Sequence, residues 1–314
     1  MSKLDRMQLK MRQAMPLEDK IRFTQRRIKE WVEHFGLDGV YVSFSGGKDS
    51  TVLLDICRKL YPDIKAMFVD TGLEYPEIKG FVKSIDNVDI IRPKMMFNKV
   101  IEQYGYPIIS KEVSECVDQA RKSLLNGKYA YRLAKLQGTL LDKDGKPSIY
   151  NQKKWKFLLD APFKISNQCC RIMKKSPAHK YGKETGRVPI IGTMATESRL
   201  RTQQYLKSGC NGFNNKIPTS TPIAFWTEQD ILEYIVKYSI DYASVYSQVL
   251  QDNNGKYYTT GCHRTGCMFC GFGCHLEPEP NRFQKLAITH PKQYDYIINK
   301  LGMGKVLDFI NVKY

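Results

Sequence analysis

The chain has 314 residues, of which 42% are hydrophobic and 26% charged. This length suits one large domain, or one domain with an accessory one, and the composition supports a sizeable core. No apolar run approaches the roughly 20 residues that a membrane span needs. Residues 1–6 carry charge, and no apolar signal region follows them. These features exclude a membrane-spanning protein, and we expect a cytoplasmic one with no membrane partner.

The net charge of +17, from 49 basic and 32 acidic residues, indicates a polyanionic partner. A nucleotide needs only a few positive groups, so an excess of this size favours a nucleic acid. The alternative is a generally basic surface with no specific partner. Nine cysteines in a cytoplasmic chain are not expected to form disulfides, and six of them fall in two tight groups that suggest a metal.

Residues 1–36 are predicted to form an N-terminal helical arm. Between Leu17 and Phe35, apolar residues recur at approximately helical spacing. Pro16 suits the first turn of this helix, and Gly36 is expected at its C-terminal cap.

The stretch from Tyr41 to Ser50, YVSFSGGKDS, joins an alternating apolar run to two adjacent glycines, and a helical run follows. This order predicts a strand, a tight turn and a helix N-terminus, where free amides and the helix dipole face an anion. Ser45, Ser50 and Lys48 add donors and charge. It is not a Walker A loop, which needs four residues between its glycines. Asp49 would repel phosphate unless it caps amides or meets a metal, and a plain turn is the alternative to an anion site.

Strands and helices are predicted to alternate after this loop, which indicates βαβ units and a parallel sheet. The expected strands are residues 64–72, 88–92, 188–192 and 222–227, and the expected helices are residues 76–84, 97–104 and 227–238. Ligands of such sheets bind at the carboxyl ends of the strands, where Ser45–Ser50 and Asp70–Gly72 both lie. Asp70 is a candidate ligand of Mg²⁺ or of a ribose, or it caps a turn.

The remaining organisation follows from charge and cysteine patterns. We predict a nucleotide-binding domain over residues 37–240, with a basic insertion over about 111–167, and a cysteine-rich helical segment over 241–314. The insertion is expected to be helical over Lys111–Gln137 and loop-like over Leu141–Asn167. Its lysines alternate with Tyr150, Trp155 and Phe157, a mixture that suits phosphate contact with base stacking. A solvated helix face with an anchored loop is the alternative.

The two cysteine groups are Cys169-Cys170 and a second run with Cys262, Cys267, Cys270 and Cys274. A Cys-x-x-Cys pair lets two thiolates reach one metal, and nearby glycines free amides to bond to sulfur. Together the groups could form a Cys₄ site, for which spacing favours neither iron–sulfur nor zinc. Free buried thiols are the alternative, and this is the reading for the cysteines outside the groups, which are Cys57, Cys116 and Cys210.

The SGGKDS sequence of Ser45–Ser50 resembles the SGGxDS loop of the PP-loop ATP pyrophosphatases, which include sulfate-activating enzymes, tRNA thiolases and relatives of phosphoadenosine-phosphosulfate (PAPS) reductase. Cys169-Cys170-Arg171, followed by Cys267 and Cys270, resembles the Cys-Cys…Cys-x-x-Cys pattern of adenylyl-sulfate reductases. The similarity spans about residues 38–275 and is weakest over 111–167. It implies an α/β fold of the adenine nucleotide alpha-hydrolase type, with a doubly wound, mostly parallel sheet.

The resemblance also implies a site. Its catalytic residues would be Lys48, Asp49 and Arg201, and its cofactors ATP or an adenylyl nucleotide, Mg²⁺ and a [4Fe–4S] cluster, with zinc as the alternative metal. The implied nucleotide-binding residues are Ser43, Ser45, Gly46, Gly47, Lys48, Asp49, Ser50, Asp70, Thr71, Gly72, Gly192, Glu197 and Arg201. The implied cluster ligands are Cys169, Cys170, Cys267 and Cys270, with Cys262 and Cys274 as alternates.

Two departures from the reductases bear on function. Those enzymes attack sulfate sulfur with a cysteine in a C-terminal Glu-Cys-Gly-Leu-His segment, whereas this sequence ends in FINVKY and its last cysteine is Cys274. They also usually carry an altered glycine loop, because their nucleotide has no β,γ-pyrophosphate, whereas the loop here is intact. We therefore expect ATP cleavage and adenylylation-driven sulfur transfer to a nucleic acid, tRNA or DNA.

Two other functions remain in view. The first is an assimilatory reductase that forms sulfite from adenylyl sulfate, with Cys262 or Cys274 as its nucleophile. The second is a non-enzymatic module that senses nucleotide and redox state. A sulfur donor or reductant protein, and a second copy in a homodimer, complete the expected partners.

Overall fold

The structure is a computed structural model of the 314-residue chain and describes residues 5–314. Residues 1–4 of the predicted N-terminal arm lie outside the described part. The chain divides into two compact units. The first comprises the residues up to Asp70, Glu74–Arg92 and Ala178–Thr265, and the second comprises Thr71–Leu73, Pro93–Pro177 and Gly266–Tyr314. This division cuts across the predicted boundary at residue 240, because the chain leaves the first unit and returns to it twice.

The first unit is built on a six-stranded sheet with the strand order β3-β2-β1-β5-β7-β6. Neighbouring strands from β3 to β7 pair in parallel, and the edge strand β6 is antiparallel to β7. The strands are β1 (Val40–Ser43), β2 (Ala66–Val69), β3 (Val88–Ile91), β5 (Val188–Ile191), β6 (Asn211–Gly212) and β7 (Thr219–Ser220). The predicted α/β fold with a mostly parallel sheet is confirmed.

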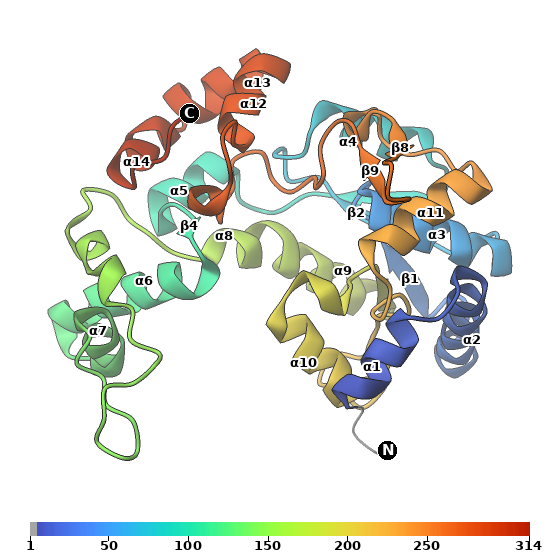
Figure 1. Cartoon of the computed structure of the whole chain (residues 1–314), viewed down its shortest axis with the longest axis horizontal. Helices are drawn as coiled ribbons and strands as arrows, with labels where there is room; N and C mark the ends of the chain where they lie inside the picture. The colour runs from blue at the N-terminus through green and yellow to red at the C-terminus, as the bar shows by residue number, and fades with distance from the viewer. Residues whose placement is uncertain (1–4) are drawn as a thin grey trace. The chain divides into compact units, whose positions relative to one another are not determined.

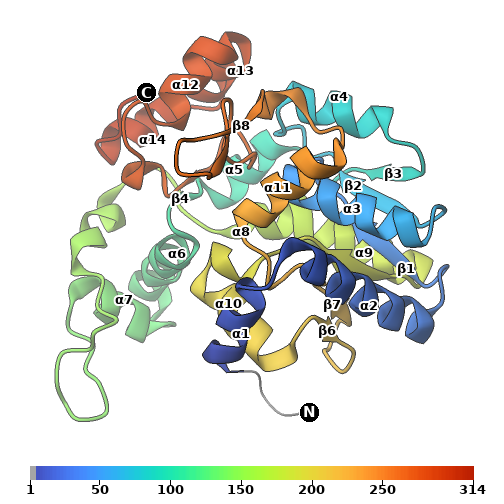
Figure 2. The same cartoon turned by 45° about the vertical axis from the view of Figure 1, so that its right-hand side comes forward.

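Helices flank the sheet, and their bounds follow the capping signals of the sequence. Those of the first unit are α1 (Arg6–Gln13), α2 (Leu17–Phe35), α3 (Lys48–Leu60), α4 (Pro76–Ser84), α9 (Ser176–Thr185, most of which lies here), α10 (Arg199–Ser208) and α11 (Glu228–Tyr238). Figures 1 and 2 show α2, α3 and α11 side by side, and these helices contact one another. Tyr41 of β1 packs edge-on against Tyr181 of α9, with ring centroids 5.1 Å apart. A short hairpin, β8 (Val249–Gln251) with β9 (Tyr257–Thr259), completes the unit.

The predicted last strand at residues 222–227 is wrong. Residues 222–225 form a turn, and the strand that joins the sheet, β7, lies just before them. The apolar run is nevertheless core, because Phe225 and Trp226 are fully buried. Trp226 also donates its indole N–H to Thr24 Oγ1 at 2.9 Å. A short buried run carries no periodicity that separates a strand from a turn.

The second unit is mainly helical. Its helices are α5 (Phe97–Tyr104), α6 (Lys111–Asn126), α7 (Ala130–Gln137), α8 (Gln168–Cys170), α12 (Arg282–Thr289), α13 (Pro291–Asp295) and α14 (Met303–Phe309). β4 (Ile108–Ile109) pairs in parallel with β10 (Gly271–Phe272), which joins the segment after α5 to the cysteine-rich segment. The predicted loop over residues 141–167 contains a 3₁₀ helix at Lys153–Asp160. No helix among residues 5–314 is both long and apolar enough to cross a membrane.

A buried ion pair joins α2 to α11. Lys20 Nζ lies 2.7 Å from both carboxylate oxygens of Asp230, and the two side chains are 2% and 11% exposed. Asp230 also accepts hydrogen bonds from the N–H and hydroxyl of Thr227, which caps α11 at the residue where this helix was expected to begin. One carboxylate therefore holds both the start of α11 and its contact with α2.

We predict that Lys20→Ala lowers the free energy of unfolding by about 3–5 kcal/mol, because it leaves the Asp230 carboxylate buried without a counter-charge. The control is Lys237→Ala, which removes the exposed pair between Lys237 and Glu18 and should cost no more than about 1 kcal/mol. Urea unfolding followed by circular dichroism measures both. Equal losses in the two variants would contradict the role given to the buried pair.

Candidate nucleotide site and cysteine cluster

The glycine loop between β1 and α3 is closed by two serine side chains. Ser45 N donates to Ser50 Oγ at 3.1 Å, and Ser50 Oγ donates to the Gly47 carbonyl at 2.8 Å. Gly47 N donates to Ser45 Oγ at 3.3 Å. These bonds hold the loop in one shape, so little ordering is required when a ligand binds.

Two glycines are needed where this loop meets its neighbours. Gly46 has φ +70°, and a Cβ there would lie 2.8 Å from the side chains of Ile78 and Val82 in α4. Gly192, directly after β5, would place a Cβ 3.2 Å from Ser50 Cα and 3.3 Å from the Asp49 carbonyl oxygen. The end of β5 thus packs against the first turn of α3. Gly192 is therefore part of this site, although it lies 142 positions after Ser50 in the sequence.

Lys48 directs its ammonium group into an acidic, buried environment. Its Nζ lies 3.0 Å from Glu228 Oε1 and 3.3 Å from Asp49 Oδ1, and it donates to the His263 carbonyl at 3.2 Å. Burial by itself would lower the pKa of Lys48, but the charges of Asp49 and Glu228 raise it above its usual value. Lys48 therefore remains a cation at neutral pH.

One carboxylate oxygen of Asp49, Oδ1, lies beside Lys48 Nζ but accepts no hydrogen bond. The Asp49 side chain is 28% exposed, yet Oδ1 is buried. Burial raises the pKa of Asp49, Lys48 lowers it, and the carboxylates of Glu197 and Glu228 raise it again. Such an acidic oxygen suits Mg²⁺. No three His, Cys, Asp or Glu side chains within residues 5–314 are arranged to hold a metal ion, so a magnesium ion here would take its other ligands from phosphate and water, as it commonly does.

Tyr246 and Thr265 contact the loop, and sequence reasoning missed both. Lys48 N donates to the Tyr246 hydroxyl at 3.1 Å, and this hydroxyl lies 2.6 Å from Thr265 Oγ1. The Tyr246 hydroxyl oxygen thus accepts the hydrogen bond that the Lys48 amide would otherwise donate to a bound anion. No local pattern could have revealed this contact, because 198 positions separate the two residues in the sequence. Glu228 was missed for the same reason.

The other predicted residues of the first unit are placed as follows. Asp70, at the end of β2, forms ion pairs with Lys79 at 2.9 Å and with Arg92 at 3.5 Å. Glu197 forms an ion pair with Arg201 and accepts a hydrogen bond from Met194 N at 2.8 Å. Ser43 ends β1 between Met67 of β2 and Ile191 of β5. Asp70 and Glu197 therefore already have cationic partners.

Thr71 and Gly72 belong to the second unit. Thr71 Oγ1 accepts a hydrogen bond from Leu73 N at 3.2 Å, and Gly72 has φ +77°. Gly72 lines a cavity of about 250 Å³ whose other walls are Leu73, Met268, Lys292, Gln293, Tyr296 and Ile297. The tight turn after β2 is thus formed by residues that sequence reasoning had singled out.

The four predicted cluster ligands all lie in the second unit and influence one another's ionisation. Cys169 Sγ donates to Cys170 Sγ at 4.0 Å. The pKa of Cys169 is raised by this bond, by burial and by the nearby Cys270 and Cys267. The bond from Cys169 lowers the pKa of Cys170 to about 6 against the effect of burial, with further help from Lys111, Lys174 and Lys175. Thiols are the donor type that a metal cluster takes, although no three of these side chains already surround one metal position within residues 5–314.

The remaining cysteines are placed differently. Cys274 is buried and donates its S–H to the Gly271 carbonyl at 3.1 Å, and burial raises its pKa to about 11. Cys262 belongs to the first unit. Cys57, Cys116 and Cys210 are buried.

Arg282 holds the Cys-x-x-Cys turn and was not predicted. Its Nη1 donates to the Cys270 carbonyl at 2.9 Å, while Nε donates to Glu277 Oε1 at 2.8 Å. Within the turn, Cys270 N donates to the Cys267 carbonyl at 2.9 Å. The guanidinium therefore fixes the backbone that positions two of the four thiols.

We predict that Gly192→Ala weakens binding of MgATP, the ligand that the resemblance implies, about tenfold or more, because its methyl group displaces the first turn of α3 at a cost of about 1–3 kcal/mol. The matched control is Gly80→Ala in α4, where a Cβ meets nothing within 4 Å. That change should leave binding intact and add up to about 1 kcal/mol of stability. Isothermal titration calorimetry measures binding, and unchanged affinity in Gly192→Ala would contradict the close approach of β5 to the loop.

Comparisons with known proteins identify the family to which the sequence is similar. The phosphoadenosine phosphosulfate reductase domain family matches residues 39–107 and 97–271. An adenosine 5'-phosphosulfate reductase of Staphylococcus haemolyticus is 26% identical over 226 residues, which is 70% of each chain. An uncharacterized protein of Methanocaldococcus jannaschii is 24% identical over 263 residues, 83% of this chain and 47% of that protein.

Among solved structures, a phosphoadenylyl-sulfate (PAPS) reductase from Candida auris in complex with phosphate has a TM-score of 0.41 and 17% identity, over 77% of this chain and 90% of that one. The family match covers more than half of the chain and includes both the glycine loop and the four clustered cysteines. This protein therefore belongs to the phosphoadenosine phosphosulfate reductase domain family.

Proposed function

We propose that this protein cleaves ATP between its α- and β-phosphates, adenylylates an oxygen atom of a nucleic acid and promotes replacement of that oxygen by sulfur. The observation that carries the proposal is the preformed glycine loop, with the orphaned Asp49 Oδ1 beside the buried ammonium group of Lys48. A phosphosulfate nucleotide has no β,γ-pyrophosphate to fill such a loop. ATP does.

Each feature of the loop supports a pyrophosphate ligand. The amides of Gly47 and Lys48 begin α3, where the helix dipole favours an anion. Lys48 can neutralise part of the phosphate charge once a ligand draws it from Glu228. Asp49 would hold Mg²⁺ together with phosphate oxygens and water, and magnesium, when bound, neutralises charge on the phosphates. Arg201 is the second cation among the candidate catalytic residues, and to bind a phosphate it must give up its ion pair with Glu197.

The proposed chemistry balances without an external oxidant or reductant. The acceptor oxygen forms a bond to the α-phosphorus, and the bond to the bridging oxygen breaks to release pyrophosphate. Hydrosulfide then attacks the atom that bears the adenylylated oxygen, and AMP departs with that oxygen. The proton of hydrosulfide ends on a released phosphate group. The protein's contribution is to position the reactants and to neutralise charge.

The four clustered thiols support a metal cofactor for the sulfur step. Cys169, Cys170, Cys267 and Cys270 would hold a [4Fe–4S] cluster, which would supply a metal site able to carry incoming sulfide. Lys111, Lys174 and Lys175 favour the thiolate form at Cys170, which ligation requires.

A second candidate is reduction of adenylyl sulfate to sulfite. Its support is the name of relatives that are 24–26% identical to this chain over 226 residues, among them the Staphylococcus haemolyticus adenosine 5'-phosphosulfate reductase. This reaction needs a cysteine nucleophile, for which Cys262 is the more accessible candidate and Cys274 the buried one.

The two candidate reactions release different products, pyrophosphate in the first and sulfite in the second. With MgATP, sulfide and total tRNA or denatured DNA, we expect the protein to release pyrophosphate, and Asp49→Asn should slow this release on the order of a hundredfold. Asp63→Asn, an exposed carboxylate elsewhere in the unit, is the matched control and should keep the wild-type rate. Sulfite from adenylyl sulfate and a dithiol, with no pyrophosphate from ATP, would replace our proposal by the second candidate.

The metal assignment has its own test. We expect anaerobically purified protein to contain iron and acid-labile sulfide, and Cys170→Ala and Cys267→Ala to lose both. Cys274→Ser should keep its iron, because serine can still donate to the Gly271 carbonyl and Cys274 is not among the four proposed ligands. Stoichiometric zinc without iron would contradict the cluster, and loss of iron in Cys274→Ser would contradict the ligand set.

A further inference from the structure

We propose that residues 128–157, the basic arm, form a binding surface for single-stranded nucleic acid. The arm contains α7, a loop over residues 138–152 and the start of the 3₁₀ helix. The inference rests on the proposed function for its purpose, because a polynucleotide acceptor needs a surface that holds it. Its evidence, however, is independent of the nucleotide site and lies wholly in the second unit.

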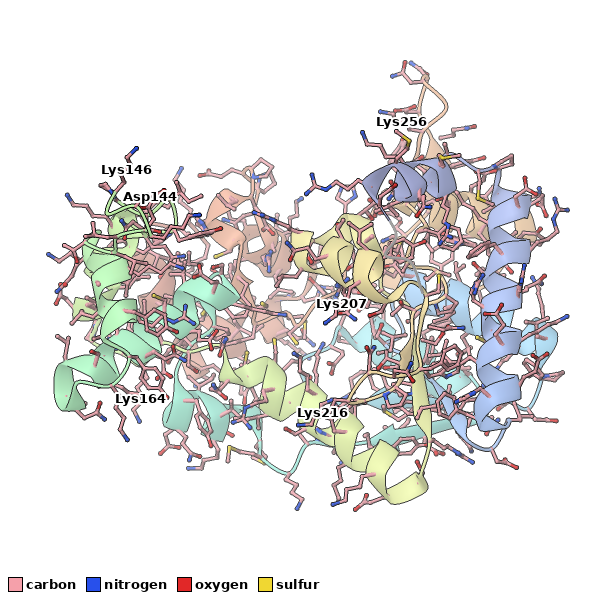
Figure 3. The ribbon with its side chains drawn as sticks, turned by 90° about the horizontal axis from the view of Figure 1, so that it is seen from below. Asp144, Lys146, Lys164, Lys207, Lys216 and Lys256 are labelled. Carbon is pink, nitrogen blue, oxygen red and sulfur yellow. The ribbon has the colours of Figure 1, made fainter. Side chains whose placement is uncertain are left out.

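The loop of the arm extends outward but is internally held. Asp142 N donates to the Lys146 carbonyl at 2.8 Å, and Leu141 forms an isolated bridge with Pro147. In Figure 1 this loop hangs below α7, and Figure 3 labels two of its residues, Asp144 and Lys146. At the other end of the arm, the Trp155 ring lies edge-on to His275, with centroids 5.2 Å apart, and anchors the 3₁₀ helix.

The arm presents lysines that have no acidic partner. Six exposed lysines make no ion pair with any residue in the described part of the chain: Lys128, Lys143, Lys146, Lys153, Lys154 and Lys156. By contrast, Arg132 and Lys135 on the inner side of α7 both pair with Glu112. The insertion as a whole, residues 111–167, has 12 basic and 6 acidic residues. Unpaired ammonium groups gathered in this way attract phosphates.

Partly exposed aromatic rings lie among these lysines, although Phe157 also packs against Phe309, with ring centroids 5.8 Å apart. Four of them are exposed, namely Tyr129 at 45%, Tyr131 at 51%, Tyr150 at 63% and Phe157 at 40%. Cations accompany the rings: Arg132 lies 4.9 Å from the centroid of Tyr131, and Lys154 lies 4.5 Å from that of Trp155. Exposed rings beside cations are the arrangement on which unpaired bases stack while their phosphates are neutralised.

The same features favour a single strand over other occupants. Bases in a duplex are already stacked on each other, so exposed rings gain nothing from them, whereas looped or unpaired bases have free faces. Lysine is depleted at the cores of protein interfaces, and six unpaired lysines would have to be desolvated there. A single-stranded nucleic acid offers phosphates to the lysines and unpaired bases to the aromatic side chains.

The binding test uses a fluorescein-labelled 20-nucleotide RNA of mixed sequence, either alone or annealed to its complement, with no ATP present. We expect fluorescence anisotropy to show tighter binding of the single strand. Its affinity should fall with salt at a slope of about −4 in log K against log salt, from six lysines at about 0.7 each. Equal affinity for the duplex, or binding only to anionic phospholipid vesicles, would overturn the proposal.

Variants separate stacking from charge. Tyr150→Ala with Phe157→Ala should weaken binding of the RNA about tenfold or more and leave the salt slope unchanged. Lys153→Gln, Lys154→Gln and Lys156→Gln together should reduce the slope by about 2. The matched control removes the same charge from exposed lysines of the first unit, Lys207→Gln, Lys216→Gln and Lys256→Gln (Figure 3), and should change neither quantity.

An equal loss in the control triple variant would overturn the assignment to the arm. Pyrophosphate release, measured on the same proteins, separates this inference from the proposed function. RNA binding through the arm without pyrophosphate release would leave the arm assigned and refute the ATP-dependent reaction. Pyrophosphate release without RNA binding would do the reverse.

Discussion

The site depends on how β1 turns into α3. The hydroxyl of Ser50 accepts a hydrogen bond from Ser45 N and donates one to the Gly47 carbonyl, and these two bonds fix the loop between β1 and α3. Parallel pairing places β5 beside β1, so that Gly192 at the end of β5 presses on the first turn of α3. The loop is thus shaped from within by serines and from outside by the neighbouring strand. The shape of the loop therefore follows from sheet topology as much as from the SGGKDS sequence.

The charged and polar partners of Lys48 also bear on which ligand the loop can bind. Lys48 is buried against Glu228 and Asp49, and the Tyr246 hydroxyl occupies its amide. In our proposal, a phosphate of the bound nucleotide would replace Glu228 as the partner of the Lys48 ammonium group. A magnesium ion would bind Asp49 Oδ1, which accepts no hydrogen bond. The protein groups that now contact Lys48 thus include a negative charge, as would the phosphate of the ligand that we propose.

Local signals in the sequence predicted much of the fold. α4 and α5 have the bounds expected, and Thr227 caps α11 where that helix was expected to begin, because capping acts within a few residues. The strand predicted at residues 222–227 was wrong, since burial alone does not distinguish a strand from a turn. The two-unit division was also missed, because it depends on where a chain returns to a sheet and not on composition.

The candidate site divides in the same way. Motifs identified the glycine loop, Gly192 and the four cysteines, because these residues are constrained by backbone approach or by thiol chemistry. Tyr246, Glu228 and Arg282 were missed, since each acts through a hydrogen bond or ion pair to a residue at least 12 positions away, which no motif spacing predicts.

The central claim is that the loop holds the β,γ-pyrophosphate of ATP, and competition calorimetry tests it most directly. With Mg²⁺ present, the account predicts that inorganic pyrophosphate displaces ATP from the wild-type protein, and that ATP binds at least tenfold more tightly than AMP or adenylyl sulfate. If pyrophosphate leaves the nucleotide in place and adenylyl sulfate binds more tightly than ATP, the loop does not hold a pyrophosphate and the claim fails.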